Sequence, residues 1–489
     1  MHMQTDNRKP IIMLNIDSLM PHALEYITQS GKAPGLQFLM EKGHYISDMV
    51  SSFPTMSVTI DSSILTGTYA DGHRIPSLHW FDTNKRQFIN YGTGFRETFR
   101  IGLKKTVYNM LHQLNDRHMN PDVTTIYEDL AKQGLSSASI NSFVYRGHNI
   151  SYLKIPRLLR TVSPFQDGRW KVNVPSIFSL GVFSKIRPFG LPTQVTAGNY
   201  KYVARELRYL IRRKKLPNFT FCIFQDMDLR LHFKGPLDTK KIQSFDKEIQ
   251  KVLHMYPTWE NAIQENIWMI IGDNGHSATG KRRKDVIVDL RKLLHQYKIA
   301  RIQRSVREKD ELAICVNQRM AYVYVLSDQL QLSTVSKALK ADRRIDLIAW
   351  RENGKVIVES GSKKGRLTFS PLGNYKDIYH QSWDIQGDFP LLDLKMVTND
   401  LINYGDYPDA LARLYGALHS HDGRFIVVTV KPGCEFKAQL TPTHLSGGAH
   451  GSLHRQESLV PLIVAGTDQL PTYHRFVDLK DYILQLFQE

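Results

Sequence analysis

Two side chains that could share a metal ion follow an apolar run of the chain. Asp228 and His232 are four residues apart and come shortly after the run Phe219–Phe224. On one helical turn this spacing places both side chains on the same face, where a carboxylate oxygen and an imidazole nitrogen can hold one divalent ion. The same pair is also common on helix surfaces that bind no metal, so the spacing alone is a weak indication.

A second group of potential ligands follows another apolar run. Asp273 and Asn274 come directly after Ile267–Ile271 and Gly272, and they offer hard oxygen ligands. His276, two residues later, offers an imidazole nitrogen. The alternative interpretation is a turn that caps a strand, because Asp-Asn-Gly is common turn chemistry.

A histidine and a threonine stand at two other favourable places. His450 lies in the small-residue stretch Gly447–Ser452, where a metal or a substrate could approach it closely; a flexible loop is the structural alternative. Thr55 follows Phe53-Pro54 and precedes a segment with a helical pattern. A hydroxyl there is normally an N-cap, but the helix N-terminus also lowers the cost of an alkoxide and of a phosphoryl anion.

The elements that must position these residues form an alternating pattern. Four apolar runs predict buried strands, at Pro10–Ile16, Phe219–Phe224, Ile267–Ile271 and Leu459–Val464. Helical patterns lie between them, at Pro34–Lys42, Thr125–Gln133, Asn199–Arg213 and Lys241–Met255. This alternation predicts an α/β fold with a mostly parallel sheet flanked by helices. Ligands gather at the carboxyl ends of such strands, and Asp17 stands at the end of the first one.

We expect one composite catalytic domain over residues 9–486, with a small α+β insertion at about 285–440. Within the insertion Ile345–Trp350 and Lys355–Glu359 read as strands, and Asn353-Gly354 between them predicts a hairpin turn. The segment Tyr152–Leu191 mixes apolar and basic residues, and we expect core packing or a lid rather than membrane contact.

Composition bounds the function and the location. The net charge of +17 and the pI of about 9.5 favour anionic partners. Three cysteines without CxxC spacing argue against a disulfide framework and against a thiolate metal site. The polar N-terminus lacks a signal-peptide core, and no run reaches the roughly 20 apolar residues of a membrane span, so we expect a cytoplasmic protein. No nucleic-acid module is evident, and the oligomeric state is not indicated.

The order of these features along the chain is more specific than any one of them. It runs through Asp17, Phe53-Pro54-Thr55, Asp228-x-x-x-His232-x-x-Gly235-Pro236, Gly272-Asp273 and Ala449-His450-Gly451. This order resembles the nucleotide pyrophosphatase/phosphodiesterase (type I phosphodiesterase) family of the alkaline phosphatase superfamily. The resemblance implies an alkaline phosphatase-like fold. It also implies a metal-dependent hydrolase of small phosphorylated substrates, with phosphodiesters or nucleotide pyrophosphates expected and a phosphothreonine intermediate on Thr55.

The resemblance further implies two divalent metal ions, with zinc as the expected metal. One would be held by Asp228, His232 and His450, and the other by Asp17, Thr55, Asp273 and the residue after Asp273. The family has a histidine where this chain has Asn274, whose amide oxygen is a harder ligand. Either His276 substitutes for it, or the site prefers manganese or calcium.

A second departure concerns the substrate. The family asparagine that contacts the phosphoryl oxygens corresponds here to Leu78, and the neighbouring His79 is a candidate for that role.

Four other functions are alternatives to a phosphodiesterase. A phosphomonoesterase or a phosphonate hydrolase would use the same fold. A sulfatase would require a Cys or Ser nucleophile with a Pro and Arg signature, which the stretch after Thr55 lacks. The net charge alone would also suit a non-catalytic anion-binding protein.

Overall fold

The computed structural model describes residues 8–154, 169–184, 186, 198–302 and 305–488. Part of the segment Tyr152–Leu191, for which we expect core packing or a lid, therefore lies outside the described residues. Within the described part, Trp170 and Phe178 are buried in a small apolar cluster with Tyr145 and Leu153. Core packing is confirmed for these two aromatic residues.

Seven strands form the central sheet, in the order β2-β24-β10-β1-β9-β5-β8. They are β1 Ile11–Ile16, β2 His44–Val50, β5 Ser137–Ile140, β8 Ile177–Ser179, β9 Phe219–Phe224, β10 Ile267–Gly272 and β24 Leu459–Ala465. The five strands from β10 to β8 are mutually parallel, whereas β24 runs antiparallel to β10 and to β2. The predicted mostly parallel sheet is confirmed, with β24 as the exception.

Helices cover both faces of this sheet because successive side chains of a strand point to opposite faces. Ile12 and Leu14 of β1 pack in the cluster that includes α1, α2, α9, α11 and α12, which span Pro21–Gln29, Pro34–Lys42, Tyr200–Arg212, Lys240–Leu253 and Trp259–Glu265. Ile11 and Met13 pack in the opposite cluster with α3, α7 and α18, which span Ser57–Thr66, Ile126–Lys132 and Leu479–Gln485. The continuous apolar runs of the sequence follow from this double burial.

A second, largely antiparallel sheet has nine strands. Its order is β13-β14-β21-β15-β16-β17-β20-β19, with β18 beside β17. The strands are β13 Leu312–Asn317, β14 Met320–Val325, β15 Ile345–Glu352, β16 Lys355–Glu359, β17 Leu367–Asp377, β18 Ser382–Gly387, β19 Leu394–Met396, β20 Leu401–Tyr404 and β21 Phe425–Val430. The predicted hairpin is present between β15 and β16, where Asn353 and Gly354 have φ values of 49° and 75°.

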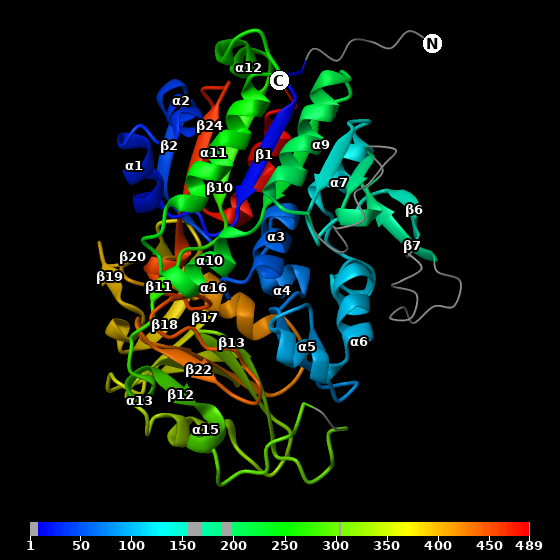
Figure 1. The fold of residues 1–489 in the computed structure, drawn as a ribbon. Coiled ribbons are helices and arrows are strands. Elements are labelled where there is room, and N and C mark those ends of the chain that lie inside the picture. Colours follow the sequence, from blue (N-terminus) through cyan, green and yellow to red (C-terminus); the bar gives the residue numbers. More distant parts are fainter. Residues whose placement is uncertain (1–7, 155–168, 185, 187–197, 303–304, 489) are drawn as a thin grey trace.

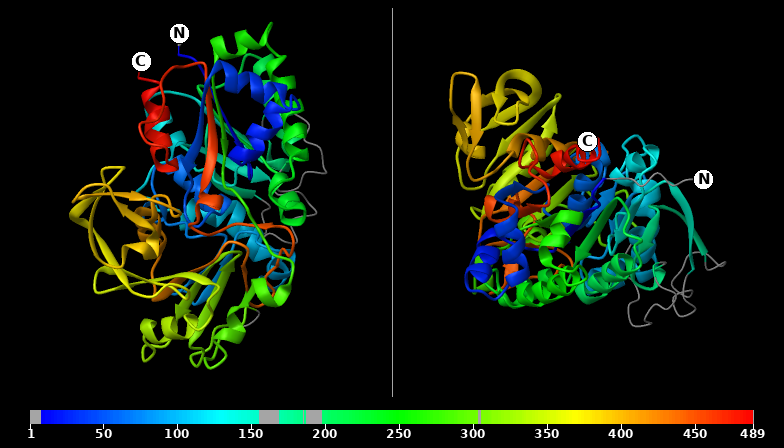
Figure 2. Two further views of the ribbon diagram at one scale, coloured as in Figure 1. Left: turned by 90° about the vertical axis from the view of Figure 1, so that its left-hand side faces the viewer. Right: turned by 90° about the horizontal axis from the view of Figure 1, so that it is seen from above.

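The second sheet shares a core with the N-terminal third of the chain. Phe53, Tyr69 and Phe81 pack in the same apolar cluster as Tyr322 and Phe369 of the second sheet. The strands of this sheet all fall between residues 312 and 430. In Figure 1 and in the left view of Figure 2 the second sheet lies below the central one.

The remaining elements complete the fold around and between the two sheets. The helices are α4 Ala70–His73, α5 Phe95–Ile101, α6 Leu103–Tyr108, η1 Asn109–His118, η2 Gly181–Phe183, α10 Met227–Lys234, α13 Arg283–Val286, α14 Leu290–Leu293, α15 Leu332–Leu339, η3 Phe389–Leu392, α16 Ala410–His419, α17 Arg455–Ser458 and η4 Phe476–Asp478. The strands are β3 His79–Asp82, β4 Gln87–Asn90, β6 Asn149–Lys154, β7 Arg169–Val174, β11 Ser277–Ala278, β12 Ile287–Asp289, β22 Glu435–Lys437 and β23 Gly448–Ala449. In the part of the chain that the structure describes, no helix has the length and apolar character needed to cross a membrane.

Strand direction explains why distant segments meet. The carboxyl ends of β1, β9 and β10 lie at one edge of the central sheet because these strands are parallel and in register. β2 ends at the same edge, since it is antiparallel to β24, which is antiparallel to β10. For the same reason β24 begins at this edge. Five chain segments therefore converge there, facing the second sheet (Figure 1).

Candidate metal centre

The first part of the site is built on α10. Asp228 and His232 lie on one turn of this helix, and His232 Nε2 is 3.1 Å from Asp228 Oδ2. His232 is nearly buried, whereas Asp228 keeps 32% of its side chain exposed. The same-face arrangement expected from the four-residue spacing is present, and although Asp228 is partly exposed, its Oδ1 is buried.

Two further histidines approach the same carboxylate from distant segments. His450, from the loop that precedes β24, places Nε2 3.2 Å from Asp228 Oδ1. His276, which follows β10, places Nε2 3.1 Å from the same oxygen. Asp228, His232 and His276 offer ligand atoms that all lie within 4.8 Å of one another, which is a grouping able to hold a metal ion.

Hydrogen bonds to carbonyl groups fix how two of the histidines are oriented. His232 Nδ1 is 2.7 Å from the Gly448 carbonyl oxygen, and His450 Nδ1 is 2.5 Å from the Thr55 carbonyl oxygen. A carbonyl oxygen can only accept, so both Nδ1 atoms must donate and each Nε2 is left with a lone pair directed at Asp228. These lone pairs face both the Asp228 carboxylate and the amide of Gln318, which can donate to them, and a cation or a proton would remove their repulsion with the carboxylate.

His276 is suited to the role of neutral ligand. Burial, only partly offset by the Asp228 carboxylate, lowers the pKa of His276 to about 3. His276 Nδ1 is buried and has no hydrogen-bond partner in the described part of the chain. The ring is therefore neutral near pH 7, which is the form that binds metal ions.

The second part of the site consists of the acids after β1 and β10. Burial and the charges of Asp273 and Asp228 raise the pKa of Asp17 well above its usual value. Burial likewise raises the pKa of Asp273 to about 6, although the Ser18 and Asn274 backbone N–H groups each donate to its Oδ1 at 2.7 Å. Three neighbouring carboxylates repel one another unless a cation is present, so this donor set fits a divalent ion.

The side chain of Asn274 gives a second, independent indication that a cation fits beside Asp17 and Asp273. Its side chain is fully buried, and its Nδ2 donates to the Gly275 carbonyl oxygen at 3.1 Å. Its Oδ1 is buried without a hydrogen-bond partner among the described residues. A buried acceptor without a partner is costly, and coordination of a cation would satisfy it.

The predicted nucleophile and a neighbouring serine point in different directions. Thr55 is fully buried, and its Oγ1 accepts a hydrogen bond from Gly451 N at 2.7 Å. Ser57, the first residue of α3, donates from Oγ to Asp273 Oδ2 at 3.3 Å. Sequence reasoning missed Ser57, although a hydroxyl at the first position of a helix was an available signal.

Two more residues of the site carried no sequence signal. Ser18 Oγ is 3.0 Å from His276 Nε2. Gln318, in the turn between β13 and β14 of the second sheet, contacts both His232 and His450. Neither residue belongs to a recognisable motif, and the position of Gln318 follows only from the packing of the two sheets.

His79 occupies a core position. Its ring is fully buried, 3.9 Å from Glu97 Oε1 and packed against Phe88. Burial lowers the pKa of His79 to about 4, so the ring is neutral near pH 7. Its backbone N–H donates to Asn317 Oδ1, and the Asn317 amide donates back to its carbonyl oxygen.

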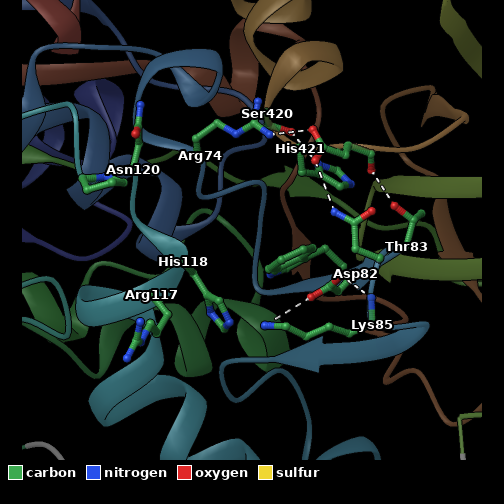
Figure 3. Close-up of a pocket in the computed structure, with 13 residues that line it drawn as sticks. Arg74, Asp82, Thr83, Lys85, Arg117, His118, Asn120, Ser420 and His421 are labelled. Atoms are coloured by element: carbon green, nitrogen blue, oxygen red, sulfur yellow. Dashed lines mark hydrogen bonds and ion pairs between the residues drawn. The ribbon is translucent and has the colours of Figure 1, made fainter.

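A separate pocket of about 290 Å³ lies between η1, the β3–β4 hairpin and the loop after α16 (Figure 3). Its lining includes Arg74 and Lys85 but none of the candidate ligands. Arg74 pairs with Asp422 at 2.8 Å, and Lys85 lies 3.8 Å from Asp82. These two cations are each paired with an acid, and so is Arg117, with Asp116 at 3.0 Å.

Comparison of the sequence with protein families gives a match. The family model described as type I phosphodiesterase/nucleotide pyrophosphatase matches residues 11–452. No curated protein sequence matches the chain.

Similar solved structures include murine ectonucleotide pyrophosphatase/phosphodiesterase 5, as an inactive variant in complex with AMP. It is 12% identical, with a TM-score of 0.57 over 98% of this chain and 95% of the other. The human counterpart gives the same four values. Phosphonoacetate hydrolase from Sinorhizobium meliloti 1021, in complex with phosphonoacetate, is 15% identical, with a TM-score of 0.59 over 98% of this chain and 96% of the other. Identities this low show a shared fold, and the predicted alkaline phosphatase-like architecture is confirmed.

Proposed function

This chain belongs to the type I phosphodiesterase/nucleotide pyrophosphatase family, and from that premise we propose that it hydrolyses phosphodiesters or nucleotide pyrophosphates. The observation that carries the proposal is that Asp228, His232 and His450 converge at one edge of the sheet. Asp17 and Asp273 lie at the same edge, directly after β1 and β10. The AMP complex of the murine relative supports a small phosphorylated substrate.

We assign the ligands to two divalent ions. Asp228, His232 and His450 would hold one, and Asp17, Asp273 and either Asn274 or His276 the other, with the hydroxyl of Thr55 or Ser57. Zinc suits the imidazole-rich set, whereas the oxygen-rich set around Asn274 also suits manganese or calcium. Divalent ions at such positions lower the pKa of a hydroxyl and neutralise charge on phosphoryl oxygens.

The attacking hydroxyl belongs in this proposal to the N-terminal end of α3. The backbone N–H groups and the dipole of this helix favour a phosphoryl anion there. The family resemblance indicates Thr55 as the nucleophile, while the contact with Asp273 makes Ser57 the second candidate. In either case a bond forms between the hydroxyl oxygen and phosphorus, the ester bond to the leaving group breaks, and water later hydrolyses the phosphorylated residue.

A substrate panel tests the proposed function. The chelated protein would be reloaded with zinc, manganese or calcium and assayed on a phosphodiester, a dinucleotide pyrophosphate, a phosphomonoester and phosphonoacetate. We expect turnover to be fastest on one of the first two and to be lost in the matched variant Asp228→Asn. If the monoester or phosphonoacetate is turned over faster, the protein is a phosphomonoesterase or a phosphonate hydrolase instead. Failure to turn over any of the four with every metal would favour a non-catalytic anion-binding protein.

A further inference from the structure

Gln318 is held in a fixed place by the turn that carries it. The turn joins β13 and β14, and Gln318 adopts a left-handed φ of 56°. Its carbonyl oxygen accepts from Phe436 N at 2.9 Å, and the next residue, Arg319, donates its N–H to the His450 carbonyl at 3.0 Å. The second sheet thereby presents one side chain to the edge of the central sheet.

The end of this side chain lies between two of the proposed ligands. Gln318 Nε2 is 2.9 Å from His450 Nε2 and 3.2 Å from His232 Nε2. Its Oε1 accepts a hydrogen bond from the His450 backbone N–H at 3.1 Å. The carboxamide therefore approaches both imidazoles from the side opposite to their Nδ1 bonds.

The distances around this group match those of a coordination shell. Asp228 lies 3.1 Å from His232 Nε2 and 3.2 Å from His450 Nε2. With metal–ligand bonds of about 2.0 Å, neighbouring ligand atoms of a tetrahedral zinc site are about 3.3 Å apart. Gln318 Nε2 lies 2.9 Å from His450 Nε2 and 3.2 Å from His232 Nε2, which is close to the spacing of neighbouring ligands of one ion.

We propose that Gln318 is the fourth protein ligand of the ion held by Asp228, His232 and His450. The inference rests on the proposed function, because it takes those three residues as ligands. An amide nitrogen has no lone pair to donate, so Oε1 must be the ligand atom. A half turn about the last side-chain torsion exchanges Oε1 and Nε2, whose positions are nearly equivalent in shape.

This half turn has a consequence for the strength of the ligand. It gives up the hydrogen bond from the His450 backbone N–H to Oε1 and places the amide nitrogen, itself a donor, against that N–H. Gln318 is therefore a weakly held ligand that a substrate oxygen can displace. His276 Nε2 lies 3.1 Å from Asp228 Oδ1 and 3.0 Å from Ser18 Oγ, which in turn donates to Asp17 Oδ1 at 3.3 Å, so His276 is taken as a ligand of the ion at Asp17 and Asp273.

Zinc titration of the chelated full-length protein tests the inference. Zinc would be competed against a chromophoric chelator in wild type, Gln318→Leu and Gln318→Glu. Leucine approximates the size of glutamine without a donor atom, whereas glutamate keeps an oxygen ligand. We expect one of the two zinc affinities to fall about 10- to 100-fold in Gln318→Leu and to be retained or raised in Gln318→Glu. X-ray absorption of the zinc-loaded proteins should show one fewer protein oxygen or nitrogen ligand in the leucine variant.

Asp228→Asn separates this inference from the proposed function. If it loses zinc while Gln318→Leu binds zinc as wild type does, the metal centre stands and Gln318 is not a ligand. If Asp228→Asn binds zinc as tightly as wild type, both assignments fail. Thermal unfolding of the chelated variants checks their fold, and Gln318→Ala replaces the leucine variant if that protein does not fold.

Discussion

Ser57 Oγ lies 3.3 Å from Asp273 Oδ2, whereas Thr55 Oγ1, two residues earlier in the chain, faces Gly451 N. The difference arises because Ser57 begins α3 and Thr55 belongs to the extended approach to that helix. The Thr55 hydroxyl and carbonyl both bond the loop that carries His450. The geometry thus gives Thr55 a supporting contact with one proposed metal ligand, His450, and gives Ser57 a direct contact with another, Asp273.

The first prediction separates these two hydroxyls. If Ser57, the second candidate, is the nucleophile, Ser57→Ala should lower kcat at least about 1000-fold, because loss of a nucleophile leaves only residual catalysis. It should leave zinc binding by Asp228 unchanged. Thr55→Val, which keeps the branched shape, should mainly weaken zinc binding, because the His450 loop loses its hydrogen bond to Oγ1. Steady-state kinetics and zinc titration of both variants measure the two effects.

The opposite outcome has a clear meaning. If Thr55→Val abolishes turnover at saturating metal while Ser57→Ala keeps near-native kcat, then Thr55 is the nucleophile, as the family resemblance implies. Trapping of the phosphorylated enzyme, followed by peptide mapping, would locate the modified residue directly.

The second prediction concerns the metal content. Purified protein should contain up to two divalent ions, and His450→Ala should lose one of them, because His450 Nε2 faces Asp228 Oδ1 at 3.2 Å. Elemental analysis after gel filtration measures the content. His295→Ala is the matched control, since this exposed histidine bonds only its own helix region, to the Lys292 carbonyl. A His450→Ala protein with unchanged metal content would exclude His450 as a ligand.

The third prediction concerns Asn274. Replacement of its amide by an imidazole, in Asn274→His, should raise zinc affinity at the Asp17–Asp273 site about 10-fold or more, because zinc prefers nitrogen to amide oxygen. Mild chelation of wild type should remove this ion first, with loss of activity. Zinc titration of the two chelated proteins measures the change. Equal affinities for both ions in both proteins would mean that Asn274 is a turn residue and that its buried Oδ1 has another role.

The fourth prediction concerns pH and lies outside the metal centre. Burial raises the pKa of Glu97 from 4.5 to about 7 in the folded protein. Between these values the folded state binds a proton that the unfolded state releases, so stability is highest at low pH and falls as pH rises through 7. A pKa difference of this size is worth about 3 kcal/mol. Urea unfolding at pH 5, 6, 7 and 8 measures the change.

Glu97→Gln is the control for this pH effect. It keeps the shape and removes the titration, so it should gain stability relative to wild type as pH rises. The groups that face Glu97 are Thr93 and Thr441, which donate hydrogen bonds to it, and the neutral His79. The difference between the two proteins isolates Glu97 from other buried acids that titrate near pH 6. A constant difference from pH 5 to 8 would contradict the raised pKa.

Much of the fold could be read from the sequence because local patterns encode it. Ile11–Ile16 and Phe219–Phe224 are buried at every position and apolar at all but one each, Asn15 and Thr220, which suits a strand covered on both faces. The antiparallel direction of β24 carried no such signal, since an apolar run has no direction. The direction of a strand depends on the edge of the sheet at which the preceding segment of the chain arrives. That edge is set by the packing of the whole sheet.

The sequence by itself determined those proposed ligands that a local pattern positions. Asp228 and His232 share a helical turn, and Asp17 and Asp273 end parallel strands, so local geometry brings each to the sheet edge. Only the tertiary structure decided what joins them. His450 and Gln318 arrive from a loop and from the second sheet, because packing of two sheets sets contacts between segments that no local pattern relates. Likewise, the sequence indicated Thr55, through the family resemblance, and gave Ser57 no role, whereas the start of α3 gave the two hydroxyls different partners.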